Sequence, residues 1–263
     1  MGADEMRVGL IAGSGIEDLY DEQRPEPRAV GTEYGDVELF LLDADGREVV
    51  FLPRHGREHS VPPHRINYRA NIRALAEMGC TCVVATNAVG SMNEQMRPGD
   101  LVLADQFLDF TRQRPLTFFD GEDGQVRHVD VTEPYCPRIR QVLREACESA
   151  LGETVHVGAT YVCAEGPRFE TPAEIEMFAQ LGGDVVGMTG VPEVVLAREA
   201  GLCYATVCVV SNWAAGISDA PITHEEVEEL MDRRQPDLFA LLREAIATVE
   251  DDETCACRKP FTC

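Results

Sequence analysis

Short apolar runs alternate with amphipathic stretches along nearly the whole chain. Apolar runs bounded by Gly, Asp or Pro predict strands, and apolar positions that recur every three to four residues predict helices. The predicted strands span residues 7–12, 37–42, 48–52, 81–89, 101–107, 154–164, 184–188 and 203–210. The predicted helices span residues 66–78, 134–151, 171–181, 191–200 and 223–248. This alternation predicts a single α/β domain with a mixed, mainly parallel sheet flanked by helices.

The domain is expected to span residues 1–249 of the 263, followed by a polar, cysteine-containing tail over residues 250–263. No apolar run approaches the ~18 residues that a membrane-spanning helix needs. The opening residues MGADEMRVGLIAGSG contain neither the basic segment nor the cleavage site of a secretion signal. The sequence therefore predicts a cytoplasmic protein that does not contact the membrane.

The formal net charge of −23 argues against a nucleic-acid partner, because binding to phosphate backbones requires lysine and arginine. Lys259 is the only lysine in the chain. An acidic surface with little lysine suits a protein that stays soluble at high salt, where screening weakens the self-repulsion. A halophilic source is therefore predicted. A GC-rich genome, which also favours arginine over lysine, remains an alternative.

Residues suited to binding an anion follow two of the predicted strands. Ser14 lies in a Gly-Ser-Gly turn, which presents backbone N–H groups and a hydroxyl. Arg54 and His55 end the apolar run VVFLPRH, where a guanidinium can grip phosphate in a bidentate manner and an imidazole can donate beside it. An ordinary turn remains the alternative for Ser14, and a solvated strand end remains the alternative for Arg54 and His55.

Neither histidine nor cysteine spacing predicts a metal site. Residues 55–59, HGREH, match the H-x-x-E-H pattern of inverted zinc peptidases, but that chemistry needs a helix, which Pro53 and Gly56 oppose. The ten cysteines include no CxxC pair and no Cys–His set with zinc-finger spacing. For Cys147 and Cys163 we expect burial as small hydrophobic residues. No metal is therefore predicted.

Small polar residues end three further strands. Asn87 and Ala88 end one strand, Thr189 follows Met188 at the end of another, and Asn212 follows the run TVCVVS. Ligand sites in open α/β sheets form at the carboxyl ends of strands. Although each residue alone could be a simple cap, the three together predict a ligand site.

Four segments carry a resemblance to a known family. They are FLPRHGREHSVPPHRINYRANIRALAEMGC, VVATNAVGSMNEQMRPGDLVLADQFLDFT, EGPRFETPAEIEMF and GMTGVPEVVLAREAGLCYATVCVVSN. The chain resembles the trimeric purine nucleoside phosphorylase and methylthioadenosine phosphorylase family over roughly residues 7–248. Its overall sequence, especially the segments NYRANIRAL and VPEVVLAREAG, is more similar to the methylthioadenosine branch of the family.

The resemblance implies a role for each candidate residue. Those that it assigns to the phosphate are Ser14, Arg54, His55, Asn87, Ala88 and Thr189. Those that it assigns to the nucleoside are Phe169, Glu170, Met188, Asn212, Ala214 and His224. Asn212, beside the departing base, and His55 are the implied catalytic residues. No cofactor is needed, because orthophosphate is the second substrate, and the implied partners are a small nucleoside, phosphate and the other subunits of a homotrimer or a dimer of trimers.

Two positions favour a 6-oxopurine base. Methylthioadenosine phosphorylases have Asp where Asn212 stands and a second Asp where Ala214 stands. Glu170 matches the enzymes for 6-oxopurine nucleosides, since a carboxylate can accept the N1 proton of hypoxanthine or guanine, whereas adenine has a bare lone pair there. Asn212 can donate to O6 or accept from a protonated N7. A capping carboxylate before the helix at residues 171–181 is the alternative for Glu170.

The implied activity is phosphorolysis of inosine or guanosine to the free base and ribose 1-phosphate. A phosphorylase of S-methyl-5′-thioinosine or S-methyl-5′-thioadenosine is the closest alternative. His224 separates the two, since a histidine can bond a 5′-hydroxyl but is left unpaired by a thioether; a solvent-facing histidine is its alternative. A nucleoside-binding regulator or a nucleoside hydrolase would not need the phosphate site.

The tail adds a cysteine pattern of its own. Cys255-Ala256-Cys257 lies in a polar segment where burial is not expected. It resembles the C-terminal CxC of some archaeal family members, in which the cysteines form disulfides. By that analogy Cys136, Cys203 and Cys208 are candidate partners. A reduced, disordered tail is the alternative.

Overall fold

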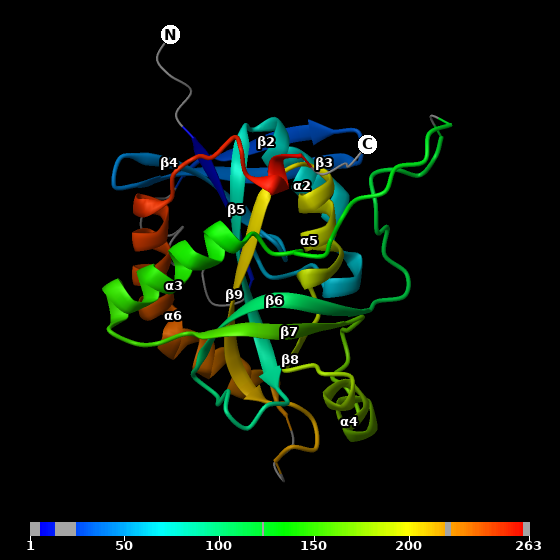
Figure 1. Cartoon of the computed structure of the whole chain (residues 1–263), viewed down its shortest axis with the longest axis vertical. Coiled ribbons are helices and arrows are strands. Elements are labelled where there is room, and N and C mark those ends of the chain that lie inside the picture. The colour runs from blue at the N-terminus through cyan, green and yellow to red at the C-terminus, as the bar shows by residue number, and fades with distance from the viewer. Residues whose placement is uncertain (1–5, 14–24, 123, 219–221, 260–263) are drawn as a thin grey trace.

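A nine-stranded mixed sheet forms the centre of the molecule (Figure 1). The computed structural model describes residues 6–13, 25–122, 124–218 and 222–259. The strands are β1 (Arg7–Ala12), β2 (Pro27–Thr32), β3 (Gly35–Ala44), β4 (Arg47–Pro53), β5 (Cys80–Ser91), β6 (Leu101–Phe110), β7 (His156–Ala164), β8 (Val185–Gly187) and β9 (Cys203–Trp213). The helices are α2 (Tyr68–Glu77), α3 (Pro137–Leu151), α4 (Pro172–Gln180), α5 (Gly190–Glu199) and α6 (His224–Thr248), with short 3₁₀ helices η1 (Pro63–Arg65) and η2 (Ala256–Arg258).

Every strand and helix predicted from the sequence is present, and β2 is the strand that the sequence did not predict. β2 is mostly exposed and pairs antiparallel with β3 at the edge of the sheet, so its sequence PRAVGT lacks an apolar run. The strand order is β2-β3-β4-β1-β5-β8-β7-β6-β9, and an additional pairing of β5 with β9 closes the last five strands on themselves. The predicted α/β class is therefore confirmed.

Helices cover both faces of the sheet, so the core has two layers. On one face α3 and α6 pack with strand residues such as Leu10, and on the other face α2 and α5 pack with residues such as Ile11. Leu10 and Ile11 are adjacent in β1, and alternate residues of a strand point to opposite faces. The continuous apolar runs in the sequence are explained by this burial on both sides.

The polar tail packs onto the body of the protein. Cys257 is 3% exposed and belongs to the core beneath α3 and α6, so the expectation that burial does not explain the tail cysteines is wrong for this residue. Cys136 and Cys203 lie beside the tail cysteines, as the resemblance implied, whereas Cys208 is not part of this group. The described cysteines are free thiols, so the implied disulfide is not found among them.

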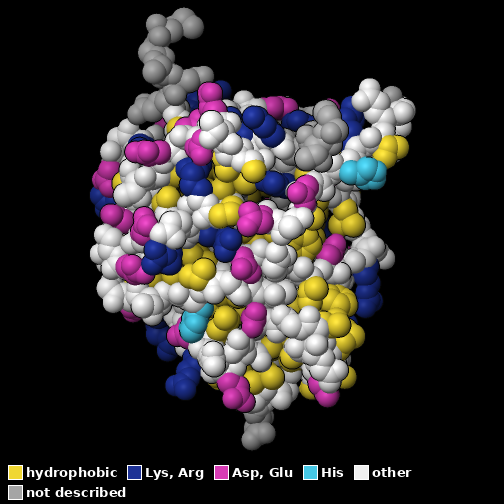
Figure 2. Space-filling model, viewed as in Figure 1, with side chains coloured by type: hydrophobic (Ala, Val, Ile, Leu, Met, Phe, Trp, Pro, Cys, Tyr) yellow, Lys and Arg dark blue, Asp and Glu magenta, His cyan; other side chains and the backbone are white. Residues whose placement is uncertain are grey.

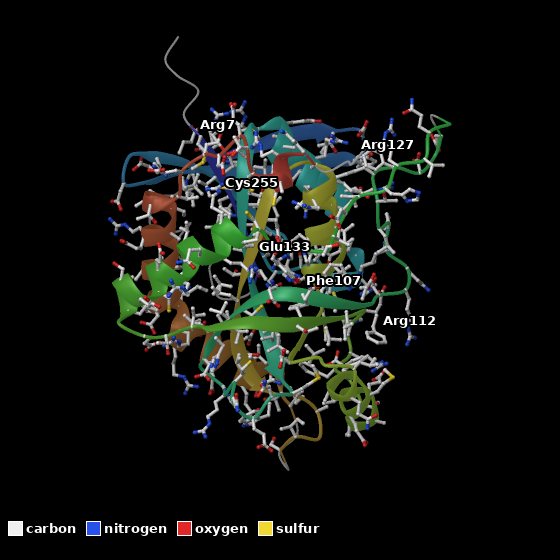
Figure 3. The ribbon with its side chains drawn as sticks, viewed as in Figure 1. Arg7, Phe107, Arg112, Arg127, Glu133 and Cys255 are labelled. Carbon is white, nitrogen blue, oxygen red and sulfur yellow. The ribbon has the colours of Figure 1, made fainter. Side chains whose placement is uncertain are left out.

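A long connection between β6 and α3 extends away from the sheet. Figure 3 places Arg112 and Arg127 on it, outside the packed strands and helices. Val126, next to Arg127, is 82% exposed. In the described residues no helix is both long enough and apolar enough to cross a membrane.

Candidate active site

A cavity of about 430 Å³ lies at the carboxyl ends of β5 and β9 and beside β8. It is lined by all the candidate residues that the structure describes, namely Arg54, His55, Asn87, Ala88, Phe169, Glu170, Met188, Thr189, Asn212, Ala214 and His224. Ser14 lies outside the described residues. Residues predicted as one site from separate motifs therefore do surround one space.

The pairing of β5 with its neighbours sets the length of the cavity. On β5, Asn87 lies opposite Cys208, and Gly90 lies opposite Asn212 of the adjacent parallel strand β9. Three residues along a strand span about 10 Å. Asn87 and Asn212 are thus held at different depths of the cavity, with enough strand between them for a sugar ring.

At the Asn87 end, the guanidinium of Arg54 is fixed by a buried ion pair. Its Nε and Nη2 donate to the carboxylate of Glu193 over 2.7 and 2.9 Å, and its Nη1 donates to the carbonyl of Thr86 over 2.8 Å. Both side chains of the pair are 1% exposed. Burial alone would lower the pKa of Arg54, but the carboxylate of Glu193 outweighs it and raises this pKa above its ordinary value.

This pairing limits how Arg54 can bind a ligand. The Nε–Nη2 edge of its guanidinium is occupied by Glu193, so the bidentate grip on phosphate expected from the sequence would have to use Nη1 and Nη2. These contacts use three of the five N–H groups of a guanidinium. One N–H on each of Nη1 and Nη2 is left by those three bonds for a ligand.

Next to Arg54, hydroxyl and amide groups form a chain of hydrogen bonds. Thr189 Oγ1 donates to Asn87 Oδ1 over 2.7 Å, Asn87 Nδ2 donates to Thr206 Oγ1 over 2.6 Å, and Thr206 Oγ1 donates to the carbonyl of Ala85 over 3.2 Å. Asn87, Thr189 and Thr206 are all buried. This series of hydrogen bonds fixes the orientation of the Asn87 amide. The second N–H of Asn87 Nδ2 takes no part in the series.

His55 is neutral and its tautomer is fixed. Its Nδ1 lies 2.8 Å from the carbonyl of Val61, and because a carbonyl only accepts, Nδ1 carries the proton. Burial, followed by the charge of Arg54, lowers the pKa of His55 to about 4. Nε2 of the neutral ring is therefore an acceptor. In this form Nε2 cannot donate, so the sequence-based expectation that the imidazole donates to an anion does not fit the ring as it is held here.

At the other end of the cavity, Glu170 has a carboxylate oxygen without a partner. Its Oε1 is buried and makes no hydrogen bond. Burial also raises the pKa of Glu170 above its ordinary value. The capping alternative fails, because the box at the start of α4 is formed by Thr171 and Glu174 instead. A buried, unpaired acceptor is costly, so Glu170 is suited to a ligand that brings a donor.

Asn212 is held close to the same end by its neighbours. Its Nδ2 donates to the carbonyl of Trp213, and its Oδ1 accepts from Ser211 Oγ, each over 2.7 Å. A side chain at Gly90 would come within 3.3 Å of this amide, so the glycine lets Asn212 lie across β5. The second N–H and the second lone pair of the amide are left by these two bonds.

Apolar and exposed groups complete the cavity. Met188 packs over Gly166, where a Cβ would meet its sulfur at 2.6 Å. Phe169 is 40% exposed. His224 begins α6, its side chain is 60% exposed, and its Nε2 lies 3.3 Å from a carboxylate oxygen of Glu228.

Two residues that were not predicted from the sequence hold the site together. Glu193 pairs with Arg54 and also accepts a 2.7 Å hydrogen bond from the Tyr204 hydroxyl. Tyr161 accepts hydrogen bonds from the backbone of Thr189 and Gly190, and any side chain at Gly187 or Gly190 would collide with its ring. A glutamate within the apolar stretch VPEVVLA was the available signal for Glu193.

Comparisons with known proteins identify the family of the chain. The chain matches the model of the phosphorylase superfamily over residues 1–247, and it belongs to that family. A 6-oxopurine nucleoside phosphorylase from Pyrococcus furiosus is 51% identical over 257 residues, covering 96% of each chain. A probable S-methyl-5′-thioinosine phosphorylase from Methanopyrus kandleri is 49% identical, covering 95% of each chain. The family and enzyme class predicted from the motifs are confirmed.

The fold is shared with solved structures. A methylthioadenosine phosphorylase from Schistosoma mansoni, solved with adenine, superposes with a TM-score of 0.88 at 35% identity and covers 97% of this chain and 95% of its own. A methylthioadenosine phosphorylase from an antarctic soil metagenomic library gives a TM-score of 0.89 at 33% identity, covering 99% of this chain and 92% of its own.

Proposed function

We propose that this chain is a 6-oxopurine nucleoside phosphorylase, which cleaves inosine or guanosine with orthophosphate. The reaction breaks the bond between the base nitrogen and the anomeric carbon and forms a bond from that carbon to a phosphate oxygen. Its products are the free purine and ribose 1-phosphate. The named relatives from Pyrococcus furiosus and Methanopyrus kandleri support a base with a 6-oxo group.

The observation that carries this proposal is the unpaired Oε1 of Glu170 in a cavity that also contains Arg54 and Asn87. Hypoxanthine and guanine carry a proton on N1, which this oxygen can accept. Adenine has no proton there and would leave the buried carboxylate unpaired. The same cavity also contains the N–H donors of Asn87, about 10 Å along β5 from the position opposite Asn212, which suits a nucleoside together with phosphate.

The phosphate is held by directed hydrogen bonds more than by net charge, because Glu193 neutralises Arg54. The donors that the described residues offer are the remaining N–H groups of Arg54 and of the Asn87 amide. His55 Nε2 accepts a hydrogen bond from the P–OH group of the monohydrogen phosphate dianion, and the proton stays on the phosphate, so the unprotonated oxygens are directed towards the sugar. The Thr189 hydroxyl can join only by giving up its bond to Asn87.

As the bond to the sugar breaks, negative charge builds up on the imidazole ring of the purine. The free N–H of Asn212 can donate to O6, or its free lone pair can accept from a protonated N7. An interaction that strengthens as the base leaves accelerates the reaction. We propose no metal or organic cofactor for this step, because phosphate itself is the nucleophile.

The test of this function is release of base from inosine and guanosine with and without orthophosphate. Release that requires phosphate or arsenate, with ribose 1-phosphate as the phosphate-dependent product, is expected. Equal release in phosphate-free buffer would identify a hydrolase, and binding without turnover would identify a nucleoside-binding regulator.

Phosphorolysis of S-methyl-5′-thioinosine is the second candidate. Ile222 and Val227 line the cavity near His224, and such apolar side chains suit a methylthio group. The base would be the same, so Glu170 and Asn212 would keep their roles. The ratio of kcat/KM for inosine and for methylthioinosine separates the two enzymes.

We further propose a cytoplasmic homotrimer, alone or paired into a hexamer, without a nucleic-acid partner. The extended connection that carries Arg127 and the exposed Val126 is available for contact with a neighbouring subunit. Light scattering should give three or six times the mass of one chain, and an active monomer would contradict it. Acidic side chains spread over the surface (Figure 2) support a halophilic source, for which loss of structure at low salt is the test.

A further inference from the structure

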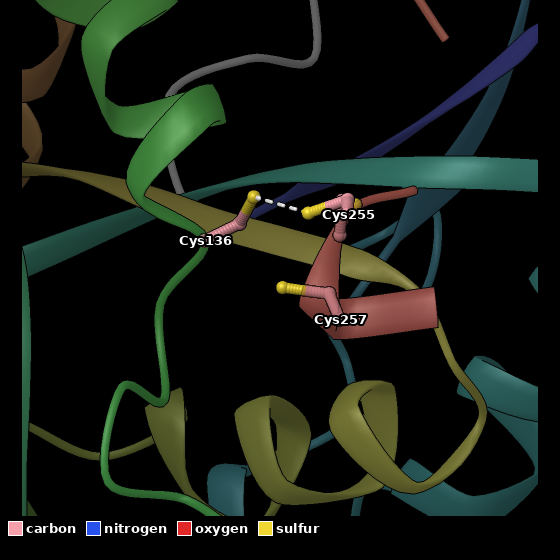
Figure 4. A group of neighbouring side chains, drawn as sticks. Cys136, Cys255 and Cys257 are labelled. Atoms are coloured by element: carbon pink, nitrogen blue, oxygen red, sulfur yellow. Dashed lines mark hydrogen bonds between the residues drawn. The ribbon is translucent and has the colours of Figure 1, made fainter. Parts of the chain in front are cut away.

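Four cysteines from separate parts of the chain lie together at the start of β9, whereas the cavity lies at the other end of that strand. Cys136 caps α3, Cys203 begins β9, and Cys255 and Cys257 lie at η2 in the tail. Their four sulfur atoms all lie within 4.8 Å of one another. Figure 4 shows the side chains of Cys136 and Cys255 pointing towards each other, with their Sγ atoms 3.8 Å apart.

The group is remote from the proposed active site. Cys203 and Asn212 are nine residues apart on β9, which corresponds to about 30 Å along a strand. None of the four cysteines lines the cavity. A role for the group is therefore independent of the nucleoside chemistry.

The distances fit one tetrahedral metal ion. Zinc binds thiolate sulfur at about 2.3 Å, so the sulfurs of a regular tetrahedral site lie about 3.8 Å apart. The observed limit of 4.8 Å leaves room for one ion after a small contraction, and it is too short for a cluster of several irons. Cys136, Cys203 and Cys257 are at most 3% exposed, while Cys255 is half-buried. Closed four-cysteine sites of this kind are structural rather than catalytic.

The surroundings favour thiolates in an otherwise acidic protein. Cys136 lies at the N-terminus of the 15-residue helix α3, where the helix dipole stabilises negative charge. The guanidinium of Arg138 lies beside Cys203. Positive groups are thus placed where a zinc tetrathiolate would carry its excess negative charge.

The tail is also held in place by contacts that do not involve sulfur. Arg258 donates to the carbonyl of Thr81 on β5 over 3.3 Å, and the backbone N–H of Cys255 donates to the carbonyl of Asp252 over 3.1 Å. The backbone N–H of Cys136 donates to the carbonyl of Tyr204 over 2.7 Å, which joins the start of α3 to β9. The ligands are therefore positioned by the fold before a metal binds.

We propose that Cys136, Cys203, Cys255 and Cys257 bind one structural zinc ion, which fastens the tail to α3 and β9. Cys136 and Cys255 are 119 residues apart in the chain, so their spacing could not reveal the site. No metal was expected from the sequence, because the spacing of cysteines and histidines along the chain reveals only ligands that lie close together in sequence.

The test begins with the full chain purified under reducing, anaerobic conditions. Metal analysis should find about one zinc per chain. Replacing zinc with Co²⁺ should give the absorption of a tetrahedral cobalt–thiolate site, and a mercurial that titrates four thiols should release the metal. Zinc removal should lower the melting temperature, and zinc alone should restore it.

The variants Cys257→Ala and Cys147→Ala form a matched pair, because both remove a buried thiol but only Cys257 belongs to the group. The first should lose zinc and the second should keep it. Two results would overturn the proposal: ten free thiols with no zinc or cobalt binding by the reduced protein, or disulfides among the four cysteines in protein that contains no metal. Metal analysis of the wild-type protein decides whether zinc binds, even if the variant Cys257→Ala folds poorly.

Discussion

The two ends of the cavity are built differently. At the end proposed to bind phosphate, Arg54 is paired with Glu193, and Asn87 is bonded to both Thr189 and Thr206. At the end proposed to bind the nucleoside, Glu170 keeps an unpaired oxygen and the His224 side chain is 60% exposed. The first set of groups is ordered by the protein itself, whereas the second set requires a ligand to complete its hydrogen bonds. Fixed donors suit the step common to all substrates, and groups without partners suit discrimination between substrates.

Breaking the ion pair between Arg54 and Glu193 should have the largest effect on stability and activity. Glu193→Gln leaves the buried charge of Arg54 without its counterion, so the free energy of unfolding should fall by about 3–5 kcal/mol, with a large loss of kcat/KM. Urea unfolding measures the first quantity. Asp45→Asn is the matched control, because it breaks the exposed pair with Arg243 and should change stability little. Equal losses in the two variants would show that Arg54 is not organised by Glu193.

Acid should lower the stability of the folded protein through His55, which lies beside Arg54 at the end of the cavity proposed to bind phosphate. The pKa of this residue is about 4 in the folded protein against an ordinary value of 6.5, so between these two pH values the unfolded chain binds more protons. The stabilisation is complete above pH 6.5 and is lost as the pH falls through 4. Between pH 7 and 5, without phosphate, the wild type should lose about 2 kcal/mol more stability than His55→Gln, as measured by urea titrations. Parallel losses would place the imidazole in solvent.

The residues that line the cavity could be predicted from the sequence far better than the protein contacts that hold their side chains in place. Asn87 and Asn212 lie in the carboxyl-terminal halves of the parallel neighbours β5 and β9, and ligand sites in such sheets form at the carboxyl ends of strands. Thr189 follows β8, which runs antiparallel to β5, so that rule does not account for its place beside Asn87. The partner of Arg54 could not be predicted in this way, because Glu193 is 139 residues away and lies in an apolar stretch. The tautomer of His55 depends on the carbonyl of Val61 and is invisible in a motif. The direction of hydrogen bonds is a property of packing, which one sequence does not reveal.

The end of the cavity that contains Glu170 should determine which purine base the enzyme accepts. Glu170→Ala should lower kcat/KM for inosine by about 10- to 100-fold, because a charge-assisted bond to N1–H is lost. Adenosine should not suffer this loss, and Glu170→Ser combined with Asn212→Asp should shift preference towards 6-aminopurines. Steady-state kinetics on both nucleosides gives the ratio. A wild type that cleaves adenosine as well as inosine would contradict the roles proposed for Glu170 and Asn212.

The smallest effect concerns the 5′ position of the sugar and the exposed histidine at the start of α6. His224 is only loosely held, since its Nε2 lies 3.3 Å from Glu228 in an exposed pair. A 5′-hydroxyl can replace that partner, whereas a thioether is at best a weak acceptor. His224→Ala should therefore reduce the preference for inosine over methylthioinosine by about 2- to 10-fold, the size of one ordinary hydrogen bond.

Glu228→Gln is the matched control for this substitution, because it removes the charge that holds the imidazole but keeps the imidazole itself. Glu228 is not among the residues lining the cavity. The preference for inosine should persist in Glu228→Gln and fall only in His224→Ala. If the wild type and both variants use inosine and methylthioinosine equally well, His224 does not bind the 5′-hydroxyl. Because Ile222 and Val227 would then be the remaining candidates for contact with the 5′ group, that result would favour the methylthioinosine enzyme.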